Sequence, residues 1–117
     1  MTLDHEKLNV YRHALALLKI CDEIIQHLPK GRAHVKEQLE DAATSVVANT
    51  AEGAGEFSGK EKARFYRMAR RSATEIAAWV DIIAKRREAP EPLLQRARHE
   101  LEIVVPMLVK LVRTCER

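Results

Sequence analysis

Aromatic residues make up only 4% of this 117-residue sequence, and glycine and proline occur four times each. Because strands favour aromatic and β-branched residues, this composition argues against a sheet and favours helices rich in Leu, Ala, Glu, Lys and Arg. Cysteine occurs only twice, as Cys21 and Cys115, each on the apolar side of its predicted helix. So few cysteines exclude a disulfide scaffold, and without a secretion signal we expect buried, reduced thiols.

Long hydrophobic runs are also missing. No apolar stretch approaches the roughly 20 residues that a membrane-spanning helix needs. The N-terminal residues have no basic flank and no apolar core of a signal peptide. We therefore expect a cytoplasmic protein without membrane contact. The length fits a single domain over residues 1–117, with one core.

Hydrophobic periodicity predicts four helices and no strand, over about 5–28, 34–52, 59–87 and 92–115. Short connections between them predict an all-α fold, an antiparallel up-down-up-down four-helix bundle. Hydrophobic residues of the first helix form two adjacent seams, wider than one neighbouring layer covers. A second copy of the chain would cover the remainder, so we expect a homo-oligomer.

Local signals mark the helix ends. Gly53 is expected to end the second helix in the left-handed conformation that glycine adopts without a clash. Ser58 and Glu61 form a capping box that starts the third helix. Pro106 is expected on the outer face of the last helix, where it would kink the helix. The predicted core face of the third helix comprises Phe65, Met68, Ala69, Ser72, Ile76, Trp79 and Ile83.

Positive charge is concentrated in the second half of the chain, although the net charge is only +3. Lys60, Arg64, Arg67 and Arg71 follow one another at helical spacing on one face, and we call them the basic row. Such a row can neutralise phosphates with strong salt dependence and little sequence specificity. The alternatives are a contact with a protein or another copy, or simple solubility. The exposed row contains no aromatic residue, so the pattern does not support base stacking.

A polar set accompanies the junction of the second and third helices: Ser45, Asn49, Glu52, Ser72 and Glu75. Buried polar atoms need partners, so these side chains are expected to bond the turn and fix the register of the two helices. The alternative is a ligand site or a catalytic site. The five histidines show no metal-ligand spacing, and no nucleophile is paired with a base, so we expect no metal, no cofactor and no enzymatic activity.

The run from Ser45 to Gly53, with its Asn-x-Ala-Glu-Gly core, resembles the signature of the 23S rRNA intervening-sequence protein family. Further matching positions are Leu8, Asn9, Val10, Tyr11, Ala14, Ser58, Glu61, Arg64, Phe65, Ala69, Ser72 and Glu75. Three residues depart from the family pattern: Glu56 replaces a common arginine, Lys62 a common aromatic residue, and Arg71 a common glycine.

This resemblance implies a bacterial four-helix bundle that assembles into a ring-shaped homopentamer without established enzymatic activity. By position, the family's characteristic residues are Asn49, Glu52, Gly53, Ser72 and Glu75. The fold is also similar to the accessory variability determinant of diversity-generating retroelements, which binds a reverse transcriptase and nucleic acid.

We therefore predict a non-enzymatic, oligomeric scaffold protein that contacts RNA or DNA, or an RNA–protein complex, through the basic row. The alternative is an adaptor that binds a protein such as a reverse transcriptase without touching phosphate.

Overall fold

The computed structural model describes residues 3–117, so the first two residues of the predicted domain lie outside the described residues. It contains a short 3₁₀ helix and four α-helices: η1 (Asp4–Lys7), α1 (Asn9–His27), α2 (Ala33–Gly55), α3 (Gly59–Arg86) and α4 (Glu91–Glu116). The predicted first helix is thus divided at Leu8, whose extended backbone separates η1 from α1. Residues 3–117 contain no strand.

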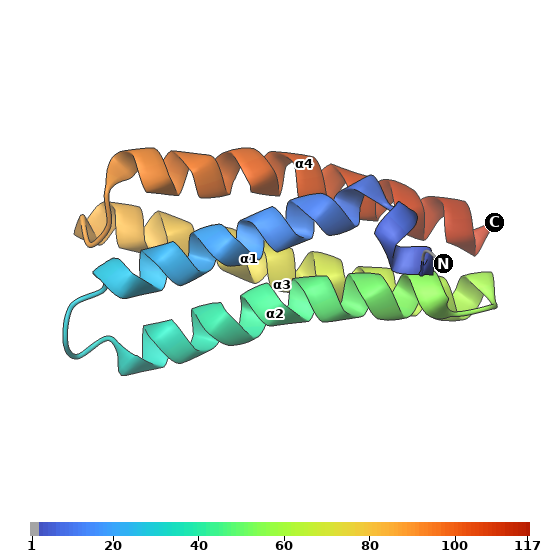
Figure 1. The fold of residues 1–117 in the computed structure, drawn as a ribbon, viewed down its shortest axis with the longest axis horizontal. Coiled ribbons are helices and arrows are strands. Elements are labelled where there is room, and N and C mark those ends of the chain that lie inside the picture. The colour runs from blue at the N-terminus through green and yellow to red at the C-terminus, as the bar shows by residue number, and fades with distance from the viewer. Residues whose placement is uncertain (1–2) are drawn as a thin grey trace.

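The four α-helices pack as a bundle in which each helix contacts two others. Pairs that follow one another along the chain are in contact, and α4 also contacts α1, while η1 packs on α2 and α1. The α1–α2 and α3–α4 connections lie at one end, and the α2–α3 turn and both termini lie at the other (Figure 1). The bundle measures 44 × 28 × 23 Å, and none of its described helices is long and apolar enough to cross a membrane.

Helix starts and stops have local causes. The Ser58 hydroxyl accepts a 3.1 Å hydrogen bond from the backbone N–H of Glu61, so the predicted N-cap of α3 is confirmed. At the other end of α3, Arg87 adopts the left-handed conformation with a φ of 55° and stops the helix. Helix α4 continues through Pro106, which is exposed, so its missing N–H leaves a carbonyl that water can reach.

The prediction for Gly53 is wrong. Helix α2 continues to Gly55, and Gly31 is the glycine with a positive φ among the described residues. Gly53 is instead buried against α3, where a Cβ atom would lie 2.6 Å from Cε1 of Tyr66. The residue is therefore glycine because an aromatic ring packs directly on its backbone, and not because the helix ends there.

The core face of α3 also differs from the predicted one. Its buried residues are Ala63, Tyr66, Ala69, Ala73, Ile76, Val80 and Ile83. Phe65, Met68, Ser72 and Trp79 are half-buried, so they flank the core and do not form its centre. Alanine supplies three of these seven buried positions, whereas Phe65, Met68 and Trp79 lie at the edge of the interface.

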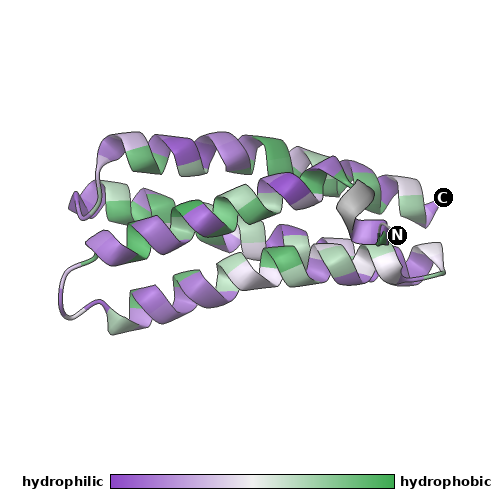
Figure 2. Ribbon diagram, in the orientation of Figure 1, coloured by the Kyte–Doolittle hydropathy of each residue, from purple (hydrophilic) through white to green (hydrophobic). Residues whose placement is uncertain are grey.

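Helix α1 buries one of its two seams and leaves the other incompletely covered. The buried residues are Val10, Ala14, Leu17, Ile20, Cys21 and Ile24, followed by Leu28 after the helix. In the second seam, Leu8, Tyr11, Leu18 and Ile25 are half-buried and Leu15 is 41% exposed. Hydrophobic segments interleave with hydrophilic ones along the visible faces of the bundle (Figure 2).

Candidate nucleic-acid interface

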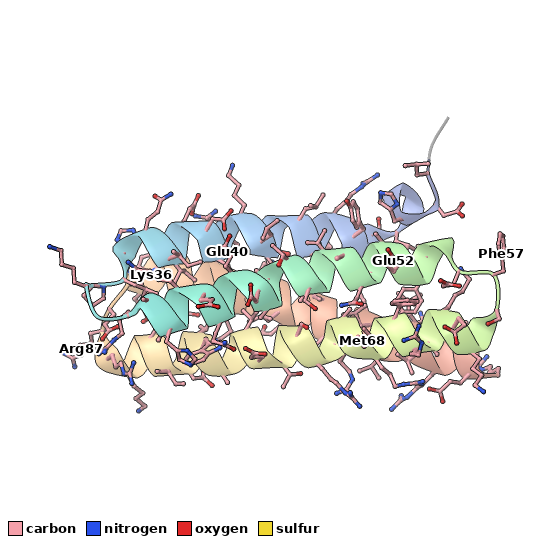
Figure 3. All side chains as sticks on the ribbon, turned by 90° about the horizontal axis from the view of Figure 1, so that it is seen from below. Lys36, Glu40, Glu52, Phe57, Met68 and Arg87 are labelled. Atoms are coloured by element: carbon pink, nitrogen blue, oxygen red, sulfur yellow. The ribbon has the colours of Figure 1, made fainter. Side chains whose placement is uncertain are left out.

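The basic row lies on α3 on the side away from the bundle core. Lys60, Arg64 and Arg71 are exposed and Arg67 is half-buried. At 100° per residue, these positions are centred roughly opposite the buried face that contains Ala73. The observed buried face lies more nearly opposite the basic row than the predicted core face does. The row therefore faces solvent more directly than the sequence pattern predicted. Basic side chains extend outward from the α3 half that starts near Phe57 (Figure 3).

Two members of the row form ion pairs. Nε of Arg64 donates a 3.0 Å hydrogen bond to Glu61, and its guanidinium carbon lies 4.5 Å from the ring centroid of Phe65. Nη1 of Arg67 donates a 2.6 Å hydrogen bond to Glu116 of α4. The side chains of the Arg67 pair are 39% and 51% exposed, so water competes with the contact. Glu61 and Glu116 thus offset part of the positive charge of the basic row, but another anion can displace them from these exposed pairs.

Lys60 and Arg71 have no ion-pair partner among the residues that the structure describes. The neighbouring cation Lys62 has a different task, because its Nζ donates to the carbonyls of Gly53 at 3.3 Å and Ala54 at 2.9 Å. It thereby caps the C-terminal carbonyls of α2. Lys60 and Arg71 are therefore the cations of the row most readily available to an external anion.

Part of the polar set joins α2 to α3. The Ser72 hydroxyl donates a 2.8 Å hydrogen bond to the Ser45 hydroxyl, and Nδ2 of Asn49 donates to the same oxygen at 2.9 Å. The Asn49 amide also donates to the Ser45 carbonyl at 3.0 Å. We call these three residues the serine bridge. This half-buried network connects α2 to α3, and its role in fixing their register stays a prediction. The carbonyls at the turn are bonded by Lys62 and not by this set.

The two glutamates of the polar set do not join the serine bridge. Glu52 is exposed on α2, on the face that also displays Met68 of α3 (Figure 3). Glu75 is exposed on α3 and accepts a 3.2 Å hydrogen bond from Nε1 of Trp79. Asn49, Glu52 and Glu75 therefore share no hydrogen bond in residues 3–117.

The buried titratable groups are held in their neutral forms. Burial, reinforced by Asp22, raises the pKa of the Cys21 thiol to about 12. Burial, with a smaller contribution from Cys115, raises the pKa of the Tyr66 hydroxyl to about 12. Neither group is ionised near neutral pH. Within the described part of the chain, no three His, Cys, Asp or Glu side chains are placed to hold a metal ion.

Two features of this region were not predicted from the sequence. Glu116 lies 49 positions from Arg67, and only the docking of α4 on α3 brings them together. Phe57 precedes α3 and has a relative exposure of 101%. Its position between two glycine-containing segments marked a turn, but no sequence signal showed that the ring would lack any cover.

Comparison with known proteins identifies a family. Residues 6–110 match the family model of the 23S rRNA-intervening sequence protein. This matched range covers most of the chain and includes the basic row, the serine bridge and Gly53. No curated protein matches the sequence.

Proposed function

This chain belongs to the 23S rRNA-intervening sequence protein family, and from that membership we propose that it is an oligomeric binding protein that contacts RNA or an RNA–protein complex through the basic row. The protein acts as a scaffold and catalyses no reaction. The observation that carries the proposal is the placement of Lys60 and Arg71 on the outer face of α3, exposed and unpaired within the described residues.

The ion pairs of Arg64 and Arg67 are compatible with this role. Exposed pairs contribute about 0–1 kcal/mol to stability, so exchanging a carboxylate for a phosphate costs little. An arginine can also bind phosphate through two parallel hydrogen bonds, whereas Arg64 and Arg67 each donate one hydrogen bond to a carboxylate. Association releases counterions from the nucleic acid, and the resulting affinity falls steeply with salt.

Self-association is the second part of the proposal. The assembling unit is an antiparallel up-down-up-down bundle, and the partly covered seam of α1 around Leu15 packs against another copy. Burial of a large aliphatic side chain contributes about 1.5–3 kcal/mol, so a row of such residues favours assembly. The proposed product is a closed ring, as the family resemblance implies, and a ring repeats the basic row around its circumference.

The proposal is tested by electrophoretic mobility shift with a mixed-sequence RNA of about 20 nucleotides at low salt, about 50 mM. We compare the wild type with Lys60→Glu/Arg71→Glu. The matched control is Lys19→Glu/Lys110→Glu, which changes the net charge equally at exposed lysines of α1 and α4.

We expect the row variant to bind at least about 10-fold more weakly, because it loses two phosphate contacts and gains repulsion. The control variant should bind nearly as well as the wild type. Equal losses in both variants would show that overall charge, and not the row, attracts RNA. Absence of wild-type binding at this salt concentration would favour the alternative, an adaptor that docks a protein such as a reverse transcriptase.

A further inference from the structure

Phe57 is the most exposed large hydrophobic residue in the described part of the chain. Its relative exposure is 101%, compared with 52% for Leu3 and 41% for Leu15. The ring projects from the turn at one end of the bundle, away from α2 and α3 (Figure 3). Leaving a phenylalanine in water forgoes about 1.5–3 kcal/mol of burial. A flat aromatic face is thus fully open to a binding partner.

The backbone on both sides of Phe57 is held in place. On one side, the N–H of Glu56 donates to the Gly53 carbonyl at 3.4 Å, and this carbonyl also accepts a hydrogen bond from Nζ of Lys62. On the other side, Ser58 caps α3 through the N–H of Glu61. The turn therefore presents the ring from a fixed position, and binding would require little ordering of the chain.

Basic side chains line a hollow whose first lining residue, Gly59, follows Phe57 by two positions. The hollow has a volume of about 370 Å³ and lies between the start of α3 and the end of α4. Its charged lining consists of Lys60, Arg67, Arg117 and the single acid Glu116. The aromatic ring and this basic hollow lie at the same end of the bundle, and Lys60 of the hollow follows Phe57 by three residues.

We propose that this end of the bundle binds an unpaired nucleotide segment, with a base stacked on Phe57 and the adjoining phosphates on Lys60 and Arg67. The inference rests on the proposed function, because it assigns the same cations to phosphate, and it adds that the ligand is single-stranded. Paired bases hide their faces within the duplex, whereas unpaired bases stack on aromatic side chains. The sequence pattern missed this arrangement because Phe57 lies in the turn, outside the basic row.

A second copy of the chain is the competing occupant. A symmetric contact through Phe57 would bring the two copies of Lys60, three residues away, toward each other, and like charges oppose such a contact. A polyanion instead complements the charge beside the ring. We therefore assign Phe57 to nucleic acid and assembly to the α1 seam.

The test measures fluorescence anisotropy with a labelled 12-nucleotide RNA of mixed sequence, presented alone and as a duplex with its complement. We compare the wild type with Phe57→Ala and Phe57→Trp. Leu3→Ala is the matched control, because it also truncates an exposed hydrophobic side chain. Light scattering and thermal melting of each variant report assembly and folding.

We expect Phe57→Ala to weaken single-strand binding roughly 5- to 100-fold and to leave duplex binding unchanged within about 2-fold. Phe57→Trp should retain single-strand affinity because it keeps an aromatic face, and Leu3→Ala should match the wild type.

Unchanged single-strand affinity of Phe57→Ala would overturn this inference while leaving the proposed function intact. The inference would also fall if single-strand and duplex binding weakened equally, or if Phe57→Ala lowered the molar mass of the assembly. A wild type that binds neither RNA would contradict both proposals.

Discussion

The backbone of Gly53 on α2 lies directly against the ring of Tyr66 on α3. A Cβ atom at position 53 would stand 2.6 Å from Cε1 and 2.8 Å from Cδ1 of the ring, closer than such atoms approach. Tyr66 is itself buried, with 3% exposure, and joins the main core. This contact gives the glycine of the Asn-x-Ala-Glu-Gly segment a physical role in packing two helices at the end that carries the candidate interface.

Gly53→Ala should destabilise the protein by about 1–3 kcal/mol, because the added methyl group forces the Tyr66 ring to move in a packed core. This loss exceeds the gain of up to about 1 kcal/mol from the better helix propensity of alanine. The matched control is Gly55→Ala in the same helix, where a Cβ atom would meet nothing within 4 Å. Chemical denaturation should show a neutral or stabilising control, and equal behaviour of the two variants would contradict the role given to Tyr66.

The serine bridge predicts a graded series. Ser72→Ala should lower stability by about 0.5–1.5 kcal/mol through loss of its hydrogen bond to Ser45. Ser45→Ala should cost more, because Ser72 and Asn49 both use that hydroxyl. Thr44→Ala is the control, since the Thr44 hydroxyl bonds only carbonyls of its own helix. If Ser45→Ala and Thr44→Ala melted alike, the bridge would not connect the helices energetically.

The two connections at the opposite end are linked by Arg32 and Glu88. The Arg32 guanidinium donates to both carboxylate oxygens of Glu88, at 2.7–3.0 Å. Hydrogen bonding to Arg32 is the main reason that the pKa of Glu88 is lowered below its usual value. A lowered folded-state pKa means that the stabilisation is present above the ordinary glutamate pKa and is lost as the pH falls through the lowered value.

Glu88→Gln should therefore melt at a lower temperature than the wild type at neutral pH. The two proteins should converge as the pH falls from the ordinary glutamate range through the lowered pKa of Glu88, where the wild-type carboxylate also becomes neutral. Thermal melting across this range tests the link, with Glu37→Gln as the control at an exposed glutamate of α2. A constant difference at every pH would mean that packing and not charge explains the effect.

Leu15→Glu should reduce self-association, because it places a charge in the partly covered seam of α1 that we assign to the contact between copies. Light scattering at micromolar concentration should give a mass well above the 13.3 kDa chain for the wild type. The variant should shift toward the monomer and remain helical. Gln95→Glu, an exposed site on α4, should keep the wild-type mass. A wild-type particle of single-chain mass would contradict the assembly.

Much of the fold followed from the sequence because helical periodicity and capping are local. Four helical segments and the Ser58 cap could be read from residues close to one another in the chain. The buried face of α3 could not be predicted in this way, because a ranking by hydrophobicity places Phe65 and Trp79 above alanine. Packing against the other helices instead buries Ala69 and Ala73 and leaves Phe65 and Trp79 half-buried. Gly53 was misassigned for the same reason, since its constraint comes from another helix.

The candidate site was only partly predictable. The spacing of the basic row follows from helix geometry alone, and the structure places these cations outside the core. Their partners depend on tertiary contacts, so the pairing of Arg67 with Glu116 had no sequence signal. The complete exposure of Phe57 likewise depends on how the turn leaves the bundle. A prediction from local patterns therefore identified the charge but missed the exposed aromatic ring in the turn before α3.

The most direct test of the account is the salt dependence of RNA binding. The logarithm of the association constant is plotted against the logarithm of salt concentration for the wild type, Lys60→Gln/Arg71→Gln and the control Lys19→Gln/Lys110→Gln. For a single-stranded RNA, each lost phosphate contact should reduce the magnitude of the slope by about 0.7, so the row variant should lose about 1.4 and the control nothing. A row variant with the wild-type slope, or a wild type with no measurable binding near 50 mM salt, would contradict the assignment of the basic row to RNA.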